Sequence, residues 1–156
     1  MDKFTNMKDK ISLPEKEILF KGKKLDIINY KDTEILENSD KVAILPYFRD
    51  EATMLMRLEH TPAYQYKRVT NYLTVITGTM EKGETPEQTI RRELYEEGGI
   101  VLNNLYPFEV EGPFFANKYG TGQIYTCLLE LPVNTYRQTK PPTDGSKHEK
   151  LSRSIK

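Results

Sequence analysis

The stretch that decides the fold is residues 78–100, which read GTMEKGETPEQTIRRELYEEGGI. It predicts one well-marked helix, because Thr85 is a favourable N-cap and Gln88 follows it at the capping-box spacing. Pro86 falls on the first helical position, where its missing N–H costs nothing. The glycine pair that begins at Gly98 supplies the stop. We therefore expect a helix between Thr85 and Gly98.

Three glutamates of this helix share one face. At 100° per residue, Glu93, Glu96 and Glu97 fall within about 100° of one another. Ile90 and Leu94 form an adjoining apolar edge that can pack on a sheet. Like charges at these spacings destabilise an isolated helix, so crowded carboxylates favour a compensating cation. Carboxylate oxygens suit Mg²⁺ or Mn²⁺, although an ordinary solvated acidic face is the alternative interpretation.

The surroundings of the helix favour the metal site. Gly78 ends an expected strand, and the loop after it returns to the start of the helix. This loop would bring backbone carbonyls and Glu84 toward the acidic face. Arg92 adjoins Glu93 and can hold a carboxylate through a charge-assisted fork.

Residues 78–100 resemble the Nudix signature G-x5-E-x7-R-E-U-x-E-E-x-G-U, in which U is a bulky aliphatic residue. The chain fills every fixed position, with Gly78, Glu84, Arg92, Glu93, Leu94, Glu96, Glu97, Gly99 and Ile100. The resemblance implies an α/β fold, namely a Nudix-type α/β/α sandwich whose mixed sheet has this helix packed on it. It also implies an enzyme that hydrolyses a nucleoside diphosphate linked to another moiety.

The resemblance also implies a set of metal ligands for Mg²⁺ (or Mn²⁺). Glu93 and Glu97 would be the main ligands, with Glu96 sharing or supporting them. The backbone carbonyl of Thr77 or Gly78 would complete the shell. Such ions neutralise a leaving diphosphate and lower the pKa of the attacking water.

The implied catalytic residues include side chains beyond these ligands. Arg92 would orient the carboxylates, through Glu84, which is also a candidate metal ligand. In relatives of the ADP-ribose type the base can be a glutamate in a loop before the last strand. Glu149 stands in that place, with Glu96 as the second candidate and Glu97 acting through the metal. The alternative for Glu149 is a solvated charge in a loop.

The remaining sequence resembles the ADP-ribose pyrophosphatase subfamily in part. Residues 17–37 are similar to its N-terminal strands, which help to build a homodimer there, and residues 56–78 are similar to its run before the signature. Pro113 approximates the proline that follows the signature in that subfamily. We expect residues 1–16 to be a polar arm and 17–156 to be a single domain.

Four side chains are candidates for binding the nucleotide. Tyr64 or Tyr66 could stack on a base, and Arg68 could clamp phosphates. Lys118 lies before a glycine-containing stretch that could line the site. The alternative is that these side chains decorate loops or an edge strand.

The function that the resemblance implies is a pyrophosphatase acting on ADP-ribose or a related nucleoside diphosphate sugar. One alternative is a house-cleaning hydrolase of nucleoside triphosphates or dinucleoside polyphosphates. Another is a nucleotide-binding sensor without catalysis, although such domains often lose the signature glutamates. RNA decapping lacks the support of a basic aromatic stripe.

Composition and charge limit the partners. Lys plus Arg and Asp plus Glu each number 23 among 156 residues, so no basic surplus favours nucleic acid or a membrane. No apolar run is long enough to cross a bilayer, and Cys127 cannot form an internal disulfide. We expect a cytoplasmic protein.

Short β-rich segments surround the helix. Strands are expected at 17–22, 24–30, 33–37, 41–48, 53–59, 71–77, 104–110, 123–131 and 151–156. Pro46 inside the fourth segment suggests an edge position or a bulge.

Overall fold

The computed structural model describes residues 16–68, 72–103, 106–135 and 153–155. The strands are β1 (Glu17–Lys21), β2 (Leu25–Tyr30), β3 (Thr33–Asn38), β4 (Lys41–Phe48), β5 (Thr53–Met54), β6 (Met56–Glu59), β7 (Tyr72–Thr74), β8 (Ile76–Thr79), β9 (Glu111–Phe115), β10 (Gln123–Glu130) and β11 (Arg153–Ile155). The α-helices are α1 (Pro62–Tyr66) and α2 (Pro86–Gly98), and Arg49–Glu51 and Val133–Thr135 form 3-10 turns. Residues 1–15 of the polar arm expected at 1–16 lie outside the described residues.

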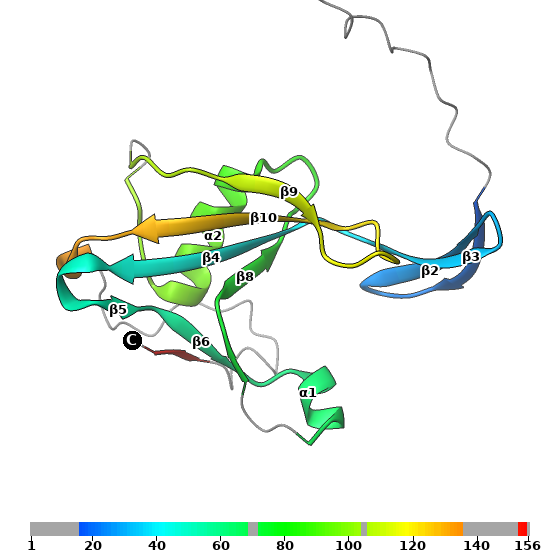
Figure 1. Cartoon of the computed structure of the whole chain (residues 1–156), viewed down its shortest axis with the longest axis horizontal. Helices are drawn as coiled ribbons and strands as arrows, with labels where there is room; N and C mark the ends of the chain where they lie inside the picture. The colour runs from blue at the N-terminus through cyan, green and yellow to red at the C-terminus, as the bar shows by residue number, and fades with distance from the viewer. Residues whose placement is uncertain (1–15, 69–71, 104–105, 136–152, 156) are drawn as a thin grey trace, which may run out of the picture.

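These strands form three sheets (Figure 1). The central sheet has the order β5-β4-β10-β9, and β8 also pairs with β4. It is mixed, because β4 and β10 run parallel while the other pairs are antiparallel. A second sheet has the order β11-β6-β7, and β1, β2 and β3 form an antiparallel meander that we call the front sheet. The expected α/β architecture with a mixed sheet is confirmed.

Helix α2 begins and ends as its sequence predicts. The Thr85 side chain accepts a hydrogen bond from the Gln88 amide, and the Gln88 side chain returns a bond to the Thr85 amide. Gly99 has φ 66°, a left-handed conformation that glycine adopts at little cost, and its N–H bonds to carbonyls of the last turn. Both ends of α2 are therefore fixed by local sequence.

The core lies between α2 and the central sheet. Strand β4 buries alternate side chains, and α2 contributes Ile90 and Leu94 from its apolar edge. The buried apolar residues of this core cluster are Val42, Ile44, Phe48, Leu55, Ile76, Ile90, Leu94, Ile100, Leu102, Cys127, Leu129 and Leu131. This packing presents the other face of α2, with its glutamates, to the sheet edge at β8. Within the described residues, neither helix is long and apolar enough to cross a membrane.

The expected edge position of Pro46 is wrong. Strand β4 lies inside the central sheet, between β10 on one side and β8 and β5 on the other. Pro46 stands where the partner changes, since β8 pairs with β4 only as far as Ile44 and β5 begins at Tyr47. The Pro46 carbonyl accepts from the Leu55 amide at 2.9 Å. A residue without an N–H is tolerated here because the ladder is already interrupted.

The strand expected at 104–110 is also displaced. Residues 104–105 lie outside the described part, 106–110 form no strand, and the strand is β9 at Glu111–Phe115. Tyr106, Phe108 and Val110 still pack against the core, which explains their alternation. The Arg91 guanidinium donates to the Asn103 and Tyr106 carbonyls at 2.9 and 3.1 Å. In a sheet, the backbone amides of a neighbouring strand would donate to these carbonyls instead.

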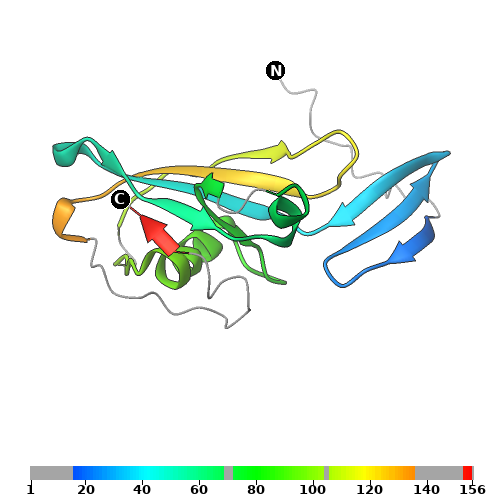
Figure 2. The ribbon, with the colours of Figure 1, turned by 90° about the horizontal axis from the view of Figure 1, so that it is seen from below.

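The front sheet is attached to the central sheet through the segment before β10 (Figure 2). The Leu36 amide donates to the Tyr119 carbonyl at 2.7 Å, and the Leu36 carbonyl accepts from the Thr121 amide at 2.9 Å. The Asn38 side chain accepts from the Gly122 amide at 3.0 Å. A Cβ at Gly122 would lie 2.7 Å from the Ser39 carbonyl oxygen, so glycine permits this close approach.

Candidate active site

A cavity of about 390 Å³ opens between the acidic face of α2, the end of β8, the start of β4 and the β1–β2 turn. Its lining is almost entirely polar and charged. The lining residues are Lys24, Lys41, Arg57, Thr77, Gly78, Thr79, Glu81, Arg92, Glu93, Glu96 and Glu97. Most of the residues implied by the signature therefore meet in one place, although they come from separate elements.

Arg92 is the organising cation of the cavity. Its Nε and Nη2 donate to the two oxygens of Glu84 at 2.9 and 3.0 Å, which is a bidentate fork. Its Nη1 donates to Glu93 at 2.6 Å and to Glu96 at 3.1 Å, and Nη2 also donates to the Thr79 carbonyl at 3.0 Å. One guanidinium thus fixes three carboxylates and a strand end.

Glu84 faces Arg92 and does not line the cavity. Besides the fork, it accepts from the Glu81 amide and the Thr89 hydroxyl, each at 2.9 Å. The Arg92 hydrogen bonds lower the pKa of Glu84 to about 2. Glu84 therefore supports Arg92 from outside the cavity lining, and its role as a metal ligand stays a prediction.

Glu93 is held against the end of β8. It is 7 % exposed, and burial raises its pKa while Arg92 opposes that rise. A Cβ built on Gly78 would collide with the Cγ, Cδ and Oε1 atoms of Glu93. Glycine at position 78 therefore makes room for this carboxylate beside the strand backbone.

Glu97 lies beside a buried arginine of β6. The Arg57 Nε is 3.4 Å from Glu97 Oε2, and its Nη1 donates to the Glu97 carbonyl at 3.3 Å. Burial raises the pKa of Glu97 to about 8, and the Arg57 charge opposes part of that rise. Glu59, also on β6, adds a like charge to this pair and carries a raised pKa from its own burial.

Sequence reasoning missed Arg57, which is only 2 % exposed. In the segment MRLE an arginine between apolar residues looks like a solvent-facing position of an alternating strand. Leu55, Arg57 and Glu59 share one face, and that face turns toward α2 rather than toward solvent. Only the tertiary fold reveals this, although a charged residue between apolar residues of an expected strand was an available signal.

The donor set suits a hard divalent cation. Carboxylates of Glu93, Glu96 and Glu97 and the backbone at Thr77 and Gly78 supply oxygen ligands, which Mg²⁺ and Mn²⁺ prefer. In the described part of the chain no three acidic, histidine or cysteine side chains already form a ready metal cage. Arg92 contacts one oxygen of Glu93 and one of Glu96.

Three of the four residues expected to bind the nucleotide, Tyr66, Arg68 and Lys118, do not line this cavity. Tyr66 ends the short helix α1, which the sequence analysis did not predict, and its side chain is 84 % exposed. Arg68 follows α1, and the Lys118 ammonium lies over the Tyr119 ring at 4.6 Å. Neither these residues nor Tyr66 line the cavity. The Tyr64 side chain and all of Glu149 lie outside the described part.

Comparison with known proteins identifies the same region. The Nudix domain family matches residues 38–152, which is most of the chain. The NAD-capped RNA hydrolase NudC of Enterobacter sp. (strain 638) is 38 % identical over 79 residues, which are 44 % of this chain and 30 % of the relative. The ADP-ribose pyrophosphatase of Escherichia coli (strain K12) is 28 % identical over 98 residues, which are 62 % of this chain and 45 % of the relative.

This chain therefore spans less than half the length of these curated relatives. The family match, however, covers the central sheet, α2 and every lining residue of the carboxylate cavity except Lys24. The chain belongs to the Nudix hydrolase family.

Proposed function

We propose that this protein hydrolyses the diphosphate of ADP-ribose or a related nucleoside diphosphate sugar, giving a nucleoside monophosphate and a sugar phosphate. The observation that carries the proposal is the single cavity lined by Glu93, Glu96 and Glu97 beside the end of β8. These carboxylates are the donors that a divalent cation needs, and the cavity is open to a ligand of nucleotide size. Similarity to an ADP-ribose pyrophosphatase supports the substrate class.

Each carboxylate of the cavity would have its own role in hydrolysis. Glu93 and Glu97, with Glu96 in support, would hold Mg²⁺ or Mn²⁺ together with a backbone carbonyl of Thr77 or Gly78. When bound, the ion supplies charge neutralisation at the diphosphate and lowers the pKa of the attacking water. Glu96, whose side chain is 40 % exposed, lines the cavity and is a candidate to accept a proton from water.

Arg92 and Glu84 act by positioning the carboxylates rather than by contacting the reacting atoms. The fork between them holds the guanidinium, which in turn sets the direction of the Glu93 carboxylate. Glu149 remains a candidate base. Tyr66, Arg68 and Lys118 contribute to nucleotide binding only if a partner chain or a bound substrate brings them to the cavity. Tyr64 remains a candidate for stacking on the base.

A substrate panel tests the proposal. Wild-type protein and Glu97→Gln are assayed with ADP-ribose, GDP-mannose, nucleoside triphosphates, diadenosine polyphosphates and NAD-capped RNA, each with Mg²⁺, Mn²⁺ or EDTA. The proposal expects metal-dependent release of AMP and ribose 5-phosphate from ADP-ribose, and loss of this release in Glu97→Gln. Preference for triphosphates or dinucleotides would favour the house-cleaning alternative.

NAD-capped RNA belongs in the panel because a relative carries that activity in its name. Preference for the capped RNA would overturn the expectation that nucleic acid is not a partner. Binding of ADP-ribose without turnover of any compound would indicate a nucleotide sensor.

We also propose a homodimer formed through the front sheet. All of β1 is exposed, and Ile18, Leu19 and Phe20 there are each about half exposed or more. Such an apolar surface favours association with a second copy. Light scattering that gives a mass near 18 kDa at micromolar concentration would contradict it. A cytoplasmic location stays a prediction.

A further inference from the structure

Two lysines of the cavity have no role in the proposed metal site. Lys24 comes from the β1–β2 turn of the front sheet, and Lys41 is the first residue of β4. The cavity's arginines are already engaged, Arg92 with three carboxylates and Arg57 with Glu97. Within the described part of the chain, neither lysine ammonium has a hydrogen bond or an ion pair.

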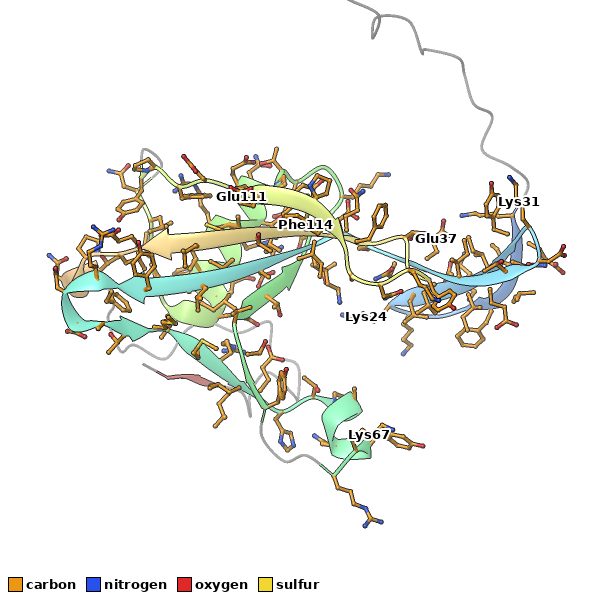
Figure 3. All side chains as sticks on the ribbon, viewed as in Figure 1. Lys24, Lys31, Glu37, Lys67, Glu111 and Phe114 are labelled. Carbon is orange, nitrogen blue, oxygen red and sulfur yellow. The ribbon has the colours of Figure 1, made fainter. Side chains whose placement is uncertain are left out.

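The position of Lys24 is fixed by a tight turn. The Gly22 amide donates to the Leu25 carbonyl at 3.1 Å and to the Asp26 side chain at 3.0 Å. A Cβ at Gly22 would collide with the Leu25 carbonyl oxygen, so the turn requires glycine there. Figure 3 shows Lys24 at the end of the front sheet that faces the core.

The front sheet itself is held in place against the core. Strand β3 exchanges backbone hydrogen bonds with the segment before β10 through Leu36, and the side chains of Asn38 and Asp40 accept from the Gly122 and Gln123 amides. The turn that carries Lys24 is therefore part of a docked element and not of a loose extension. Lys41 is similarly fixed, because it pairs with Thr79 on one side and Ile124 on the other.

We propose that Lys24 and Lys41 form a phosphate-binding wall opposite the glutamates, and that substrate affinity depends on their charge. This inference rests on the proposed function, because it assigns the binding of the same diphosphate. The glutamates hold the metal on the α2 side, and the two ammonium groups receive non-bridging phosphate oxygens on the front-sheet side. A lysine ammonium suits this role because it acts as a point charge with three donors.

Binding of a ligand that resists hydrolysis tests the inference directly. The affinities of α,β-methylene-ADP, AMP and adenosine are measured by titration calorimetry, in Mg²⁺, for wild type, Lys24→Gln and Lys41→Gln. Lys23→Gln is the matched control, since it removes the same charge from the same turn but Lys23 does not line the cavity. Lys24→Arg keeps the charge and should retain binding.

We expect each cavity variant to weaken the binding of α,β-methylene-ADP about twofold to fivefold, which is the effect of losing one exposed charge pair. The loss should be smaller for AMP and absent for adenosine, while Lys23→Gln matches wild type. A purely structural role would weaken all three ligands alike and would lower the melting temperature. Equal binding by Lys24→Gln, Lys41→Gln and Lys23→Gln would overturn the inference, as would equal losses for adenosine. Hydrolysis is not measured, so failure of the substrate panel and failure of this inference are separate results.

Discussion

Replacing Gly78 by alanine should damage both the stability and the site. The new Cβ would overlap the Glu93 side chain, which is buried and bonded to Arg92 at 2.6 Å. Forcing a methyl group into such a space costs about 1–3 kcal/mol, and losing a hydrogen bond between charged groups costs about 1.5–3 kcal/mol. The total, roughly 2.5–6 kcal/mol, lowers the melting temperature by about 5–24 °C at about 2–4 °C per kcal/mol.

The matched control for this variant is Gly98→Ala, at the last residue of α2. A Cβ at Gly98 meets the flexible end of Ile76 at 3.2 Å, and alanine is favoured over glycine inside a helix by about 1 kcal/mol. We therefore expect Gly98→Ala to unfold near the wild-type temperature. Thermal unfolding by circular dichroism is measured for both variants, together with ADP-ribose hydrolysis. Gly78→Ala with the stability and the activity of Gly98→Ala would refute the reasoning.

Three further changes test the charges and the cap. Burial raises the pKa of Glu97 to about 8, so below that pH Mg²⁺ must displace the Glu97 proton in order to bind. The Mg²⁺ affinity measured by calorimetry should therefore rise up to tenfold per pH unit from pH 6 to about 8 and then become constant. An Mg²⁺ affinity that does not change with pH would contradict this prediction. The pKa of Glu84 is lowered to about 2 from 4.5, so its contribution to stability is present above pH 4.5 and is lost as pH falls toward 2. Glu84→Gln should therefore cost about 1–2 kcal/mol at pH 7, after allowance for solvent screening, and this difference from wild type in urea unfolding should shrink on acidification. Thr85→Ala removes the N-cap of α2 and should cost about 1 kcal/mol in the same assay, whereas an unchanged midpoint would mean that the capping box contributes nothing.

Local sequence predicted the parts of the fold that local chemistry determines. The capping box at Thr85 and the glycine pair after α2 act within a few residues, so the helix was predicted with its ends. The front-sheet strands were also predicted closely, because turn residues bound each of them. The predictions of an edge position for Pro46 and of a strand at 104–110 were wrong, because strand pairing in both places depends on partners far away in the sequence.

The candidate site likewise has a part that the local sequence predicts and a part that only the tertiary fold reveals. The glutamates of α2 and Arg92 lie on one helix, and the signature spacing predicts their meeting. Arg57, Lys24 and Lys41 reach the same cavity from β6, the front sheet and β4, so only the assembled sheets reveal them. The burial of Arg57 and the positions of the two exposed lysines are tertiary properties that no single segment of the chain encodes.

We propose that the carboxylate face of α2 holds the divalent ion that hydrolysis requires. Two measurements on wild type and Glu97→Gln test this site most directly: Mn²⁺ binding by electron paramagnetic resonance, and AMP release from ADP-ribose. We expect wild type to bind Mn²⁺ and to release AMP only with metal present, and Glu97→Gln to lose both. Release that persists in EDTA, or full turnover by Glu97→Gln, would contradict it.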